Sequence, residues 1–256
     1  MKAPPSAVRF VMLSASPIAA LLLWEVCARV GWVDQRFFPA PSAIVYYLFV
    51  VSPQQGIITD ISASLMRIFW GYSLGCFIGA ALGIAMGLSK TLRMVFYPLI
   101  AVTYPIPKIA ILPLIMLVFG IGELSKIVVV GIGSFFLVLM NTLHGVDSLD
   151  RIYHDVARVY KIKQKSFILR VVLPGALPAI FTGLKLAIGY SLVIVVAAEF
   201  SGADQGIGYL IWQSWETFSI KAMYAGIFVI GALGLLFSYG LDALERRLIP
   251  WRQKDK

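Results

Sequence analysis

Long apolar runs alternate with short polar segments along the chain, and this pattern predicts a bundle of membrane-spanning helices. Several runs reach the ~20 residues that a helix needs to cross the hydrocarbon core of a bilayer. The strands of a membrane barrel would alternate in polarity over about ten residues, and no such alternation is present. The pattern predicts one all-α transmembrane domain over residues 1–256, with six helices at about 8–29, 68–88, 92–119, 126–146, 179–199 and 222–243.

The second apolar run carries a glycine at every fourth position. A ridge of small residues lets a neighbouring helix approach closely, and packing then drives helix association in the membrane. Internal packing within one subunit is the favoured interpretation, and a surface that slides during gating is the alternative. The ridge consists of Gly71, Gly75, Gly79, Gly83 and Gly87.

The third apolar run is interrupted by Pro98, Pro105, Pro107 and Pro113. Proline lacks a backbone donor, so inside a membrane the freed carbonyls need another partner. Broken helices of this kind line a cavity or a buried pathway, and a charge such as Lys108 within one is a candidate functional residue. Two interpretations of Lys108 stay open: a residue of a translocation pathway, or an amine that snorkels or pairs with a freed carbonyl.

Composition supports the assignment to the membrane class. Hydrophobic residues make up 59% of the chain and charged residues 14%, with a mean hydropathy of +0.85. Soluble domains average nearer 45–50% apolar and roughly 25% charged residues. The first run follows Lys2 and Arg9 as a signal peptide would, but it is longer than a signal core and no small-residue cleavage site follows, so we expect a retained helix.

The net charge of +9 is distributed as membrane topology requires. Basic residues gather at both ends of the chain, near Lys90, and in the loop at 147–177, whereas the other loops are richer in Asp and Glu. By the positive-inside rule this places both termini and the 147–177 loop in the cytoplasm. The charge therefore predicts topology and gives no reason to expect nucleic acid as a partner.

The sequence contains no recognisable catalytic constellation. It lacks the GxxxxGK[ST] pattern of a phosphate-binding loop, as well as HExxH and GxSxG. Cys27 and Cys76 lie in apolar runs, where a thiol acts as a small hydrophobe, so neither a disulfide nor a metal site is expected. The carboxylates are read as scattered along loops, which argues against a proton-relay pump. We therefore expect a chain that is not an enzyme.

The longest polar passage, Asp155 to Pro178, lies between two apolar runs and is rich in Lys and Arg. Asp155, Arg158 and Ile162 recur at helical spacing, which predicts a short helix. Pro178 is expected to open the next apolar helix. A short exposed helix on the basic side of the membrane is suited to contact a soluble partner; an ordinary basic loop is the alternative.

This passage resembles the EAA loop of permease subunits in bacterial ABC importers. An acidic residue and two small ones, Asp155, Val156 and Ala157, precede Arg158, and Leu173-Pro174 follow at the distance that the family shows. The resemblance implies that the loop is a coupling helix that docks on an ATPase subunit. One position departs from the pattern, because Lys161 stands where the family carries glycine, and this puts the local turn geometry in question.

Two further passages are similar to permeases for nitrate, sulfonates and taurine: PKIAILPL, which begins at Pro107, and AEF…GIGYLI. By this resemblance the broken run, with Pro105, Pro107, Lys108 and Pro113, belongs to the translocation pathway. The second passage, with Glu199, Gly206 and Gly208, belongs to an external gate or to the docking face for a binding protein, with a plain loop as the alternative.

The resemblance implies the fold and the assembly of a type I ABC importer in the bacterial inner membrane. Two copies of the permease would associate with two cytoplasmic ATPase subunits, which bind ATP and Mg, and with a periplasmic or lipid-anchored solute-binding protein. This chain itself would bind no cofactor. Transport would proceed by alternating access, with a sulfonate such as taurine, or nitrate, as substrate; bicarbonate and thiamine-precursor pyrimidines stay open. The rival from another class is a self-sufficient ion-coupled transporter or channel.

Overall fold

The structure is a computed structural model that describes residues 6–251, with side chains from Ala15 onward except that of His154. Lys2, the side chain of Arg9 and the basic residues after Trp251, on which part of the topology prediction rests, lie outside this description. Within it the chain contains helices and turns and no strand, which confirms the all-α prediction. The α-helices are α1 (Ser6–Val30), α2 (Pro41–Tyr46), α3 (Ile57–Leu88), α4 (Lys90–Thr103), α5 (Leu112–Phe119), α6 (Glu123–Asp147), α7 (Arg151–Val159), α8 (Gln164–Phe167), α9 (Leu173–Glu199), α10 (Ile207–Glu216) and α11 (Ile220–Leu248).

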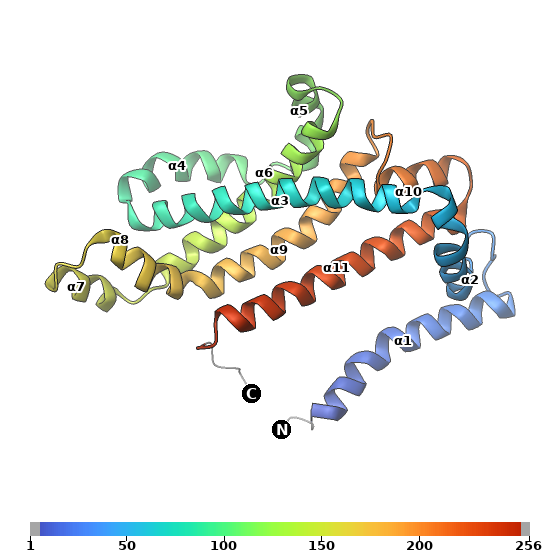
Figure 1. Ribbon diagram of the computed structural model, residues 1–256, viewed down its shortest axis with the longest axis horizontal. Coiled ribbons are helices and arrows are strands. Elements are labelled where there is room, and N and C mark those ends of the chain that lie inside the picture. The colour runs from blue at the N-terminus through green and yellow to red at the C-terminus, as the bar shows by residue number, and fades with distance from the viewer. Residues whose placement is uncertain (1–5, 252–256) are drawn as a thin grey trace.

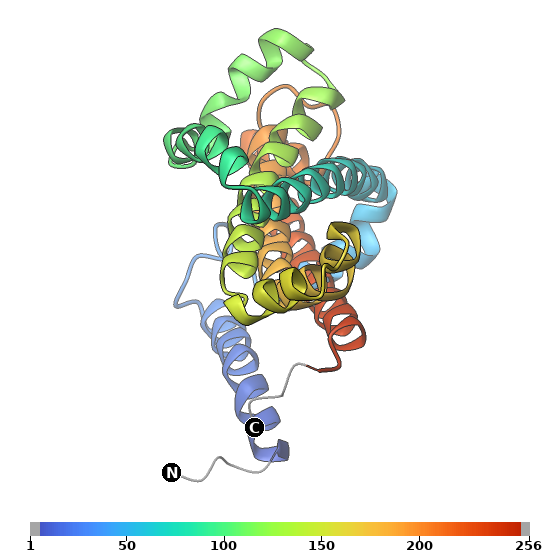
Figure 2. The same ribbon diagram turned by 90° about the vertical axis from the view of Figure 1, so that its left-hand side faces the viewer.

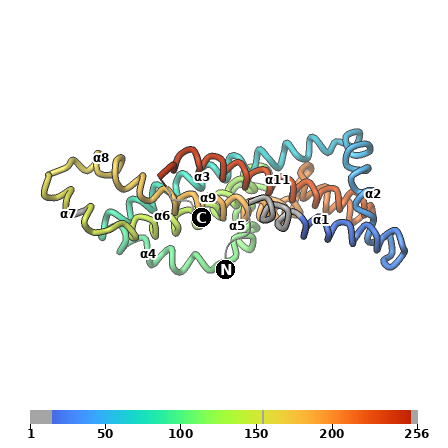
Figure 3. The backbone as a smooth tube through the Cα atoms, turned by 90° about the horizontal axis from the view of Figure 1, so that it is seen from below, coloured from blue at the N-terminus to red at the C-terminus, as the bar shows by residue number. Residues whose placement is uncertain are grey.

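Shorter helical turns join several of these helices. Two π-helical turns, η1 (Tyr47–Val51) and η4 (Ile168–Val172), extend α2 and connect α8 to α9. Two 3-10 turns, η2 (Ser52–Gln55) and η3 (Lys108–Ile111), precede α3 and α5. The molecule is elongated, with α7 and α8 at one end and α1 and α2 at the other (Figure 3).

Within residues 6–251, four helices are long and apolar enough to cross a membrane: α3, α6, the continuous helix Gln164–Glu199 and α11. A fifth span is formed if α4 and the segment Lys108–Phe119 are taken together, and these two are bent by 91° at the break between them. The broken third run is therefore confirmed. The first predicted span, at about 8–29, lies partly outside the residues whose side chains are described, so this count does not cover it and a sixth span stays a prediction.

Two predicted helix starts are wrong. The second helix begins at Ile57 and not near residue 68, because Arg67 ends the apolar run in the sequence but is buried within the helix. Pro178 does not open the fifth helix, since α9 begins at Leu173 with Pro174 in its first turn and continues through Pro178. Within the helix, Pro178 removes the donor that would have bonded the carbonyl of Pro174.

Helix α6 lies at the centre of the bundle and packs along both α3 and α9, while α11 runs beside α9 and α1 diverges from the bundle (Figures 1 and 2). The glycine ridge of α3 faces α6. A Cβ atom on Gly75 would lie 2.2 Å from the carbonyl oxygen of Gly131, and one on Gly79 would lie 2.6 Å from that of Phe135. The two backbones are thus in direct contact, which only glycine permits, and the ridge packs inside the subunit.

Candidate functional site

Helix α7 lies at one tip of the molecule, beyond the end of α6 (Figures 1 and 2). The side chain of Asp150 caps its N-terminus by accepting a hydrogen bond from the backbone N–H of Ile152 at 3.0 Å. Ala157 turns inward, against the cluster of buried residues at the bases of α6 and α9. The apolar residues of the opposite face are between 45% and 76% exposed: Ile152, Tyr153, Val156, Val159 and Tyr160.

This exposed set repeats at the three- and four-residue spacing of one helical face, so it forms a continuous apolar stripe. The charged residues Arg151, Asp155 and Arg158 are also exposed on the same helix. An apolar stripe with charged borders is the usual appearance of a surface that contacts another protein.

Lys161 ends α7 in the conformation that glycine would adopt, with a φ of 49°. The N–H of Ile162 donates to the carbonyl of Ala157 at 2.9 Å, and the N–H of Lys161 donates to that of Arg158 at 3.1 Å. These two bonds form a Schellman motif, which requires a left-handed residue at the position of Lys161. Lys161, which stands where the family has glycine, therefore keeps the geometry of the turn but places backbone strain at this residue.

The break between α4 and α5 is held together by Lys108, which is 5% exposed. Its ammonium donates to the carbonyls of Thr103, Tyr104 and Ile106 at 2.7, 2.9 and 2.9 Å. Pro107 has no N–H to donate to the carbonyl of Thr103, which accepts from the N–H of Ile106 at 3.3 Å and from Lys108 instead. Of the two interpretations of Lys108, carbonyl pairing is thus the one visible in the structure.

Lys108 also lines a pocket of about 500 Å³ between the broken segment, α6 and α9. Pro105 and Pro107 line the same pocket. Pro113 occupies the first turn of α5 and is not among the lining residues. Three of the four residues predicted for the pathway in this segment are therefore brought together.

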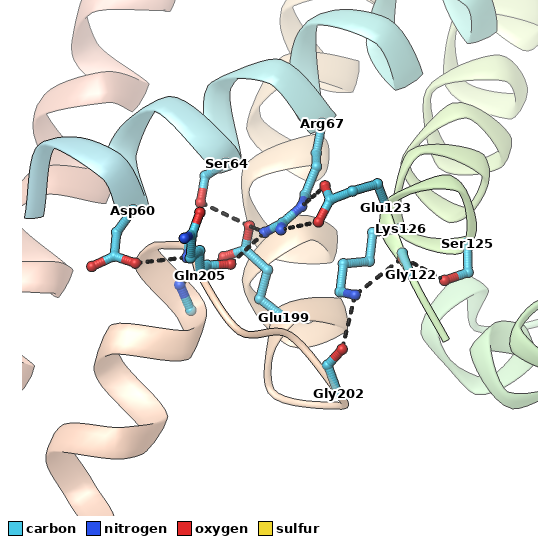
Figure 4. Close-up of polar contacts among 12 residues, drawn as sticks. Asp60, Ser64, Arg67, Gly122, Glu123, Ser125, Lys126, Glu199, Gly202 and Gln205 are labelled. Carbon is cyan, nitrogen blue, oxygen red and sulfur yellow. Dashed lines mark hydrogen bonds and ion pairs between the residues drawn. The ribbon is translucent and has the colours of Figure 1, made fainter. Parts of the chain in front are cut away.

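A cluster of ionised side chains lies where α3, α6 and the loop after α9 meet (Figure 4). The guanidinium of Arg67, which is 2% exposed, donates to Glu199 at 2.7 Å and to both carboxylate oxygens of Glu123 at 2.5 and 2.6 Å. Its remaining bond goes to the carbonyl of Gln205 at 2.8 Å. One arginine therefore joins three segments that are far apart in the sequence.

The Glu199 carboxylate is fully buried and accepts three strong hydrogen bonds. Besides Arg67, the hydroxyl of Ser64 and the N–H of Gly208 donate to it, each at 2.7 Å. Gly206, with a φ of 134°, brings its own N–H to Asp60 at 2.8 Å. A Cβ on Gly206 would lie 2.5 Å from the carboxyl carbon of Glu199, so glycine is needed for the loop to approach the cluster.

Lys126, 1% exposed, completes the cluster by donating to the carbonyls of Gly122 and Gly202 at 3.1 and 3.0 Å (Figure 4). The expectation that the carboxylates are scattered along loops is wrong for Asp60, Glu123 and Glu199, which gather around Arg67. The sequence signal for this site was a charge inside an apolar helix, at Arg67 and at Lys126.

Lys185 is bound by two carboxylates of α11. Its ammonium pairs with Asp242 and, at 2.5 Å, with Glu245. It therefore ties α9 to α11.

A second pocket, of about 760 Å³, lies at the end of the molecule opposite α7. Gln35, Arg36, Phe37, Tyr47 and residues 218–221 line it. Arg36 pairs with Asp34, and hydrogen bonds from this guanidinium hold the pKa of the Asp34 carboxyl below its usual value. Among the described residues, no group of His, Cys, Asp and Glu is arranged to hold a metal ion.

Known proteins resemble the chain over most of its length. It is 36% identical over 249 residues to the taurine transport system permease protein TauC of Escherichia coli (strain K12), a match that covers 95% of this chain and 90% of TauC. The putative aliphatic sulfonates transport permease protein SsuC of Bacillus subtilis (strain 168) is 32% identical over 92% of this chain and 86% of its own length. The nitrate import permease protein NrtB of Leptolyngbya laminosa is 35% identical over 78% of this chain and 72% of its own length.

The fold is that of a known transporter structure as well. An inward-facing crystal structure of the MetNI methionine ABC transporter superimposes with a TM-score of 0.70 at 15% identity, covering 78% of this chain and 99% of the matched one. The sequence profile described as "Binding-protein-dependent transport system inner membrane component" matches residues 71–250. The chain is therefore a multi-pass membrane protein and belongs to the family of binding-protein-dependent transport system inner membrane components.

Proposed function

We propose that this chain is the permease subunit of an ATP-driven importer for a small anion of the sulfonate, taurine or nitrate type. The observation that carries the proposal is the exposed apolar stripe of α7 at one tip of a bundle of long apolar helices. A contiguous apolar stripe on a surface outside the membrane marks a contact with another protein, and an ATPase subunit is the partner that the family supplies.

In this proposal α7 is the coupling helix, and Asp155 to Arg158 contact the ATPase through the exposed side of that helix. Helix α7 follows directly on α6 and leads into the continuous helix Gln164–Glu199. Since α6 has 25 residues, it extends about 37 Å at 1.5 Å per residue. Displacement of α7 would therefore be carried along two rigid helices to the opposite side of the membrane.

Transport would follow alternating access. ATP binding closes the two ATPase subunits, moves the docked helices and shifts the permease from the inward-facing to the outward-facing state, because ATP binds the two states with different affinity. ATP and Mg would be bound by the ATPase, and this chain would bind no cofactor. A second copy of the chain and an external solute-binding protein would complete the assembly in the bacterial inner membrane, with α7 and both termini cytoplasmic.

The substrate class rests on the relatives, whose names specify taurine, aliphatic sulfonates and nitrate. All three substrates carry an anionic group of small size. The prolines and Lys108 of the broken helix, together with Glu199, Gly206 and Gly208 near the α9–α10 loop, would form the pathway and its outer gate.

The test is to purify the tagged chain in mild detergent from its native host and to identify its partners by mass spectrometry. Recovery of an ATPase subunit and a solute-binding protein is expected. If the chain were recovered alone and still moved taurine or nitrate in liposomes, the importer assignment would be refuted.

A matched pair of variants locates the contact. Val159→Asp puts a charge on the stripe of α7 and should reduce ATPase recovery at least tenfold, because a carboxylate is costly to bury in an apolar contact. Ile121→Asp is the control, since Ile121 is equally exposed, at 76%, but precedes the opposite end of α6. Equal recovery with both variants would exclude α7 as the docking site.

A further inference from the structure

The pocket beside Lys108 lies where a transported substrate would bind. Its walls come from the non-helical turn at residues 104–108, from α6 at Gly133, Phe136 and Leu137, and from α9 at Leu186 and Tyr190. Helix α6 runs from Glu123 to Asp147, so its lining residues lie near the middle of a membrane-spanning helix. Transporter sites form where a discontinuous helix meets its neighbours at this depth.

The charge in this pocket is not compensated by an anion. Lys108 is the single charged residue among the described residues that line it, and no described carboxylate forms an ion pair with its ammonium. The partners of the ammonium are the three backbone carbonyls and the rings of Phe136 and Tyr104, whose centroids are 4.1 and 5.9 Å away. Carbonyls and rings orient a cation but leave its full unit of charge in place.

The hydrogen-bonding capacity of Lys108 is already used. An ammonium has three N–H donors, and the three carbonyls accept all of them. An anion in the pocket would therefore feel the charge without bonding directly to Nζ. Tyr104 and Tyr190 also line the pocket, and neither hydroxyl bonds to a described residue, so each keeps an O–H donor.

We propose that this pocket is a transit site for a small anion, such as an alkyl sulfonate, attracted by the carbonyl-held charge of Lys108 and hydrogen-bonded by the tyrosine hydroxyls. The proposal rests on the proposed importer function and adds the site and its mode of recognition. A charge that attracts an ion without binding it directly suits a pathway, since the ion must also leave. The same charge repels cations.

The experiment measures the sign of the potential in the pocket. Leu186→Cys places a thiol on the pocket wall at a position that is 53% exposed, in a full-length chain whose native thiols are removed by Cys27→Ser and Cys76→Ala. The thiol is then allowed to react with two methanethiosulfonates, the anionic 2-sulfonatoethyl reagent and the cationic 2-trimethylammonioethyl reagent. The ratio of their rates reports the local charge, and the isolated chain is used, so the result does not depend on ATPase binding.

Three backgrounds are compared: Lys108, Lys108→Gln and Lys108→Arg. Glutamine keeps N–H donors for the carbonyls but removes the charge, whereas arginine keeps both. A unit charge within several Å of the thiol, in a medium of effective dielectric about 20, changes the anion-to-cation rate ratio by about tenfold or more. The ratio should favour the anionic reagent with Lys108, fall about tenfold with Lys108→Gln and be restored by Lys108→Arg.

Two controls keep the outcome decisive. Val159→Cys, on α7, reports the potential at a remote surface and should show the same ratio in all three backgrounds. Thermal unfolding of each variant identifies any loss of structure. An unchanged ratio at Leu186→Cys in a folded Lys108→Gln protein would refute the proposal and reduce Lys108 to a cap for the broken helix. Failure of the chain to recruit an ATPase would refute the importer function and leave this measurement intact.

Discussion

Replacing Glu199 by glutamine tests whether the buried ion cluster is a structural junction. The substitution preserves the volume of the side chain and removes its charge. It leaves Arg67, which is 2% exposed, paired only with Glu123, whose side chain is 64% exposed. One of the two carboxylate oxygens becomes an NH₂ group, which cannot accept the hydrogen bond from the N–H of Gly208 or from Arg67.

The expected loss of unfolding free energy follows from the burial of Arg67 and Glu199. Removing one partner of a buried, hydrogen-bonded ion pair costs about 3–5 kcal/mol, because the other charge stays buried without compensation. Since Glu123 still pairs with Arg67, the lower end, about 3 kcal/mol, applies here. For a chain of this size that corresponds to a fall of about 6–12 °C in the midpoint of thermal unfolding.

The assay is thermal unfolding in a fixed detergent at a fixed scan rate, followed by tryptophan fluorescence. Glu123→Gln is the matched control, because it removes the other carboxylate from the same arginine at an exposed position, where an ion pair contributes about 1 kcal/mol or less. The double variant Arg67→Met with Glu199→Gln should lose less unfolding free energy than the sum of the two single variants, because the effects of residues in direct contact are not additive. Equal shifts for Glu199→Gln and Glu123→Gln, or a shift below about 2 °C for the first, would refute the reasoning.

Two further predictions concern the backbone. Lys161→Gly should stabilise the chain by about 1 kcal/mol, because glycine adopts the left-handed conformation at the end of α7 without strain, and an unchanged or lowered unfolding midpoint would contradict this. Gly75→Ala should destabilise the chain by about 2 kcal/mol or more, since the new methyl group would overlap the backbone of α6. Gly240→Ala, in α11 with nothing within 4 Å of the new Cβ, is the control and should stabilise by about 0.5–1 kcal/mol; a stabilising Gly75→Ala would mean that α3 and α6 are not in contact.

The parts of the fold that local sequence rules determine were predictable. Pro105 and Pro107 lie in the break between α4 and the segment Lys108–Phe119, where the structure bends by 91°, whereas Pro98 is accommodated within α4. Glycines spaced by four fall on one helical face, so a close helix contact follows from spacing alone. The short helix at residue 155 followed from the same reasoning, because its apolar and charged positions repeat with helical period.

The ion cluster was not predictable in this way, because its pairs are distant in the chain. Arg67 and Glu199 are 132 residues apart, and nothing local indicates that the loop after α9 returns to α3. An apolar-run criterion ends a helix at the first charge, which is why the start of α3 was placed after Arg67. The same charge, seen as buried within a helix, would have identified a functional or structural junction.

Three buried cations follow one rule in this structure. Arg67, Lys108 and Lys126 each donate to backbone carbonyls that lie at a helix end or in an interhelical loop. In hydrocarbon such carbonyls have no water to bond, so a break in a helix is tolerated only where another donor is supplied. The cations at these breaks therefore make irregular backbone compatible with the membrane. It follows that a broken helix and a buried lysine or arginine should be sought together, and that Lys108 combines both roles: its N–H groups hold the break, while its charge acts on the pocket beside it.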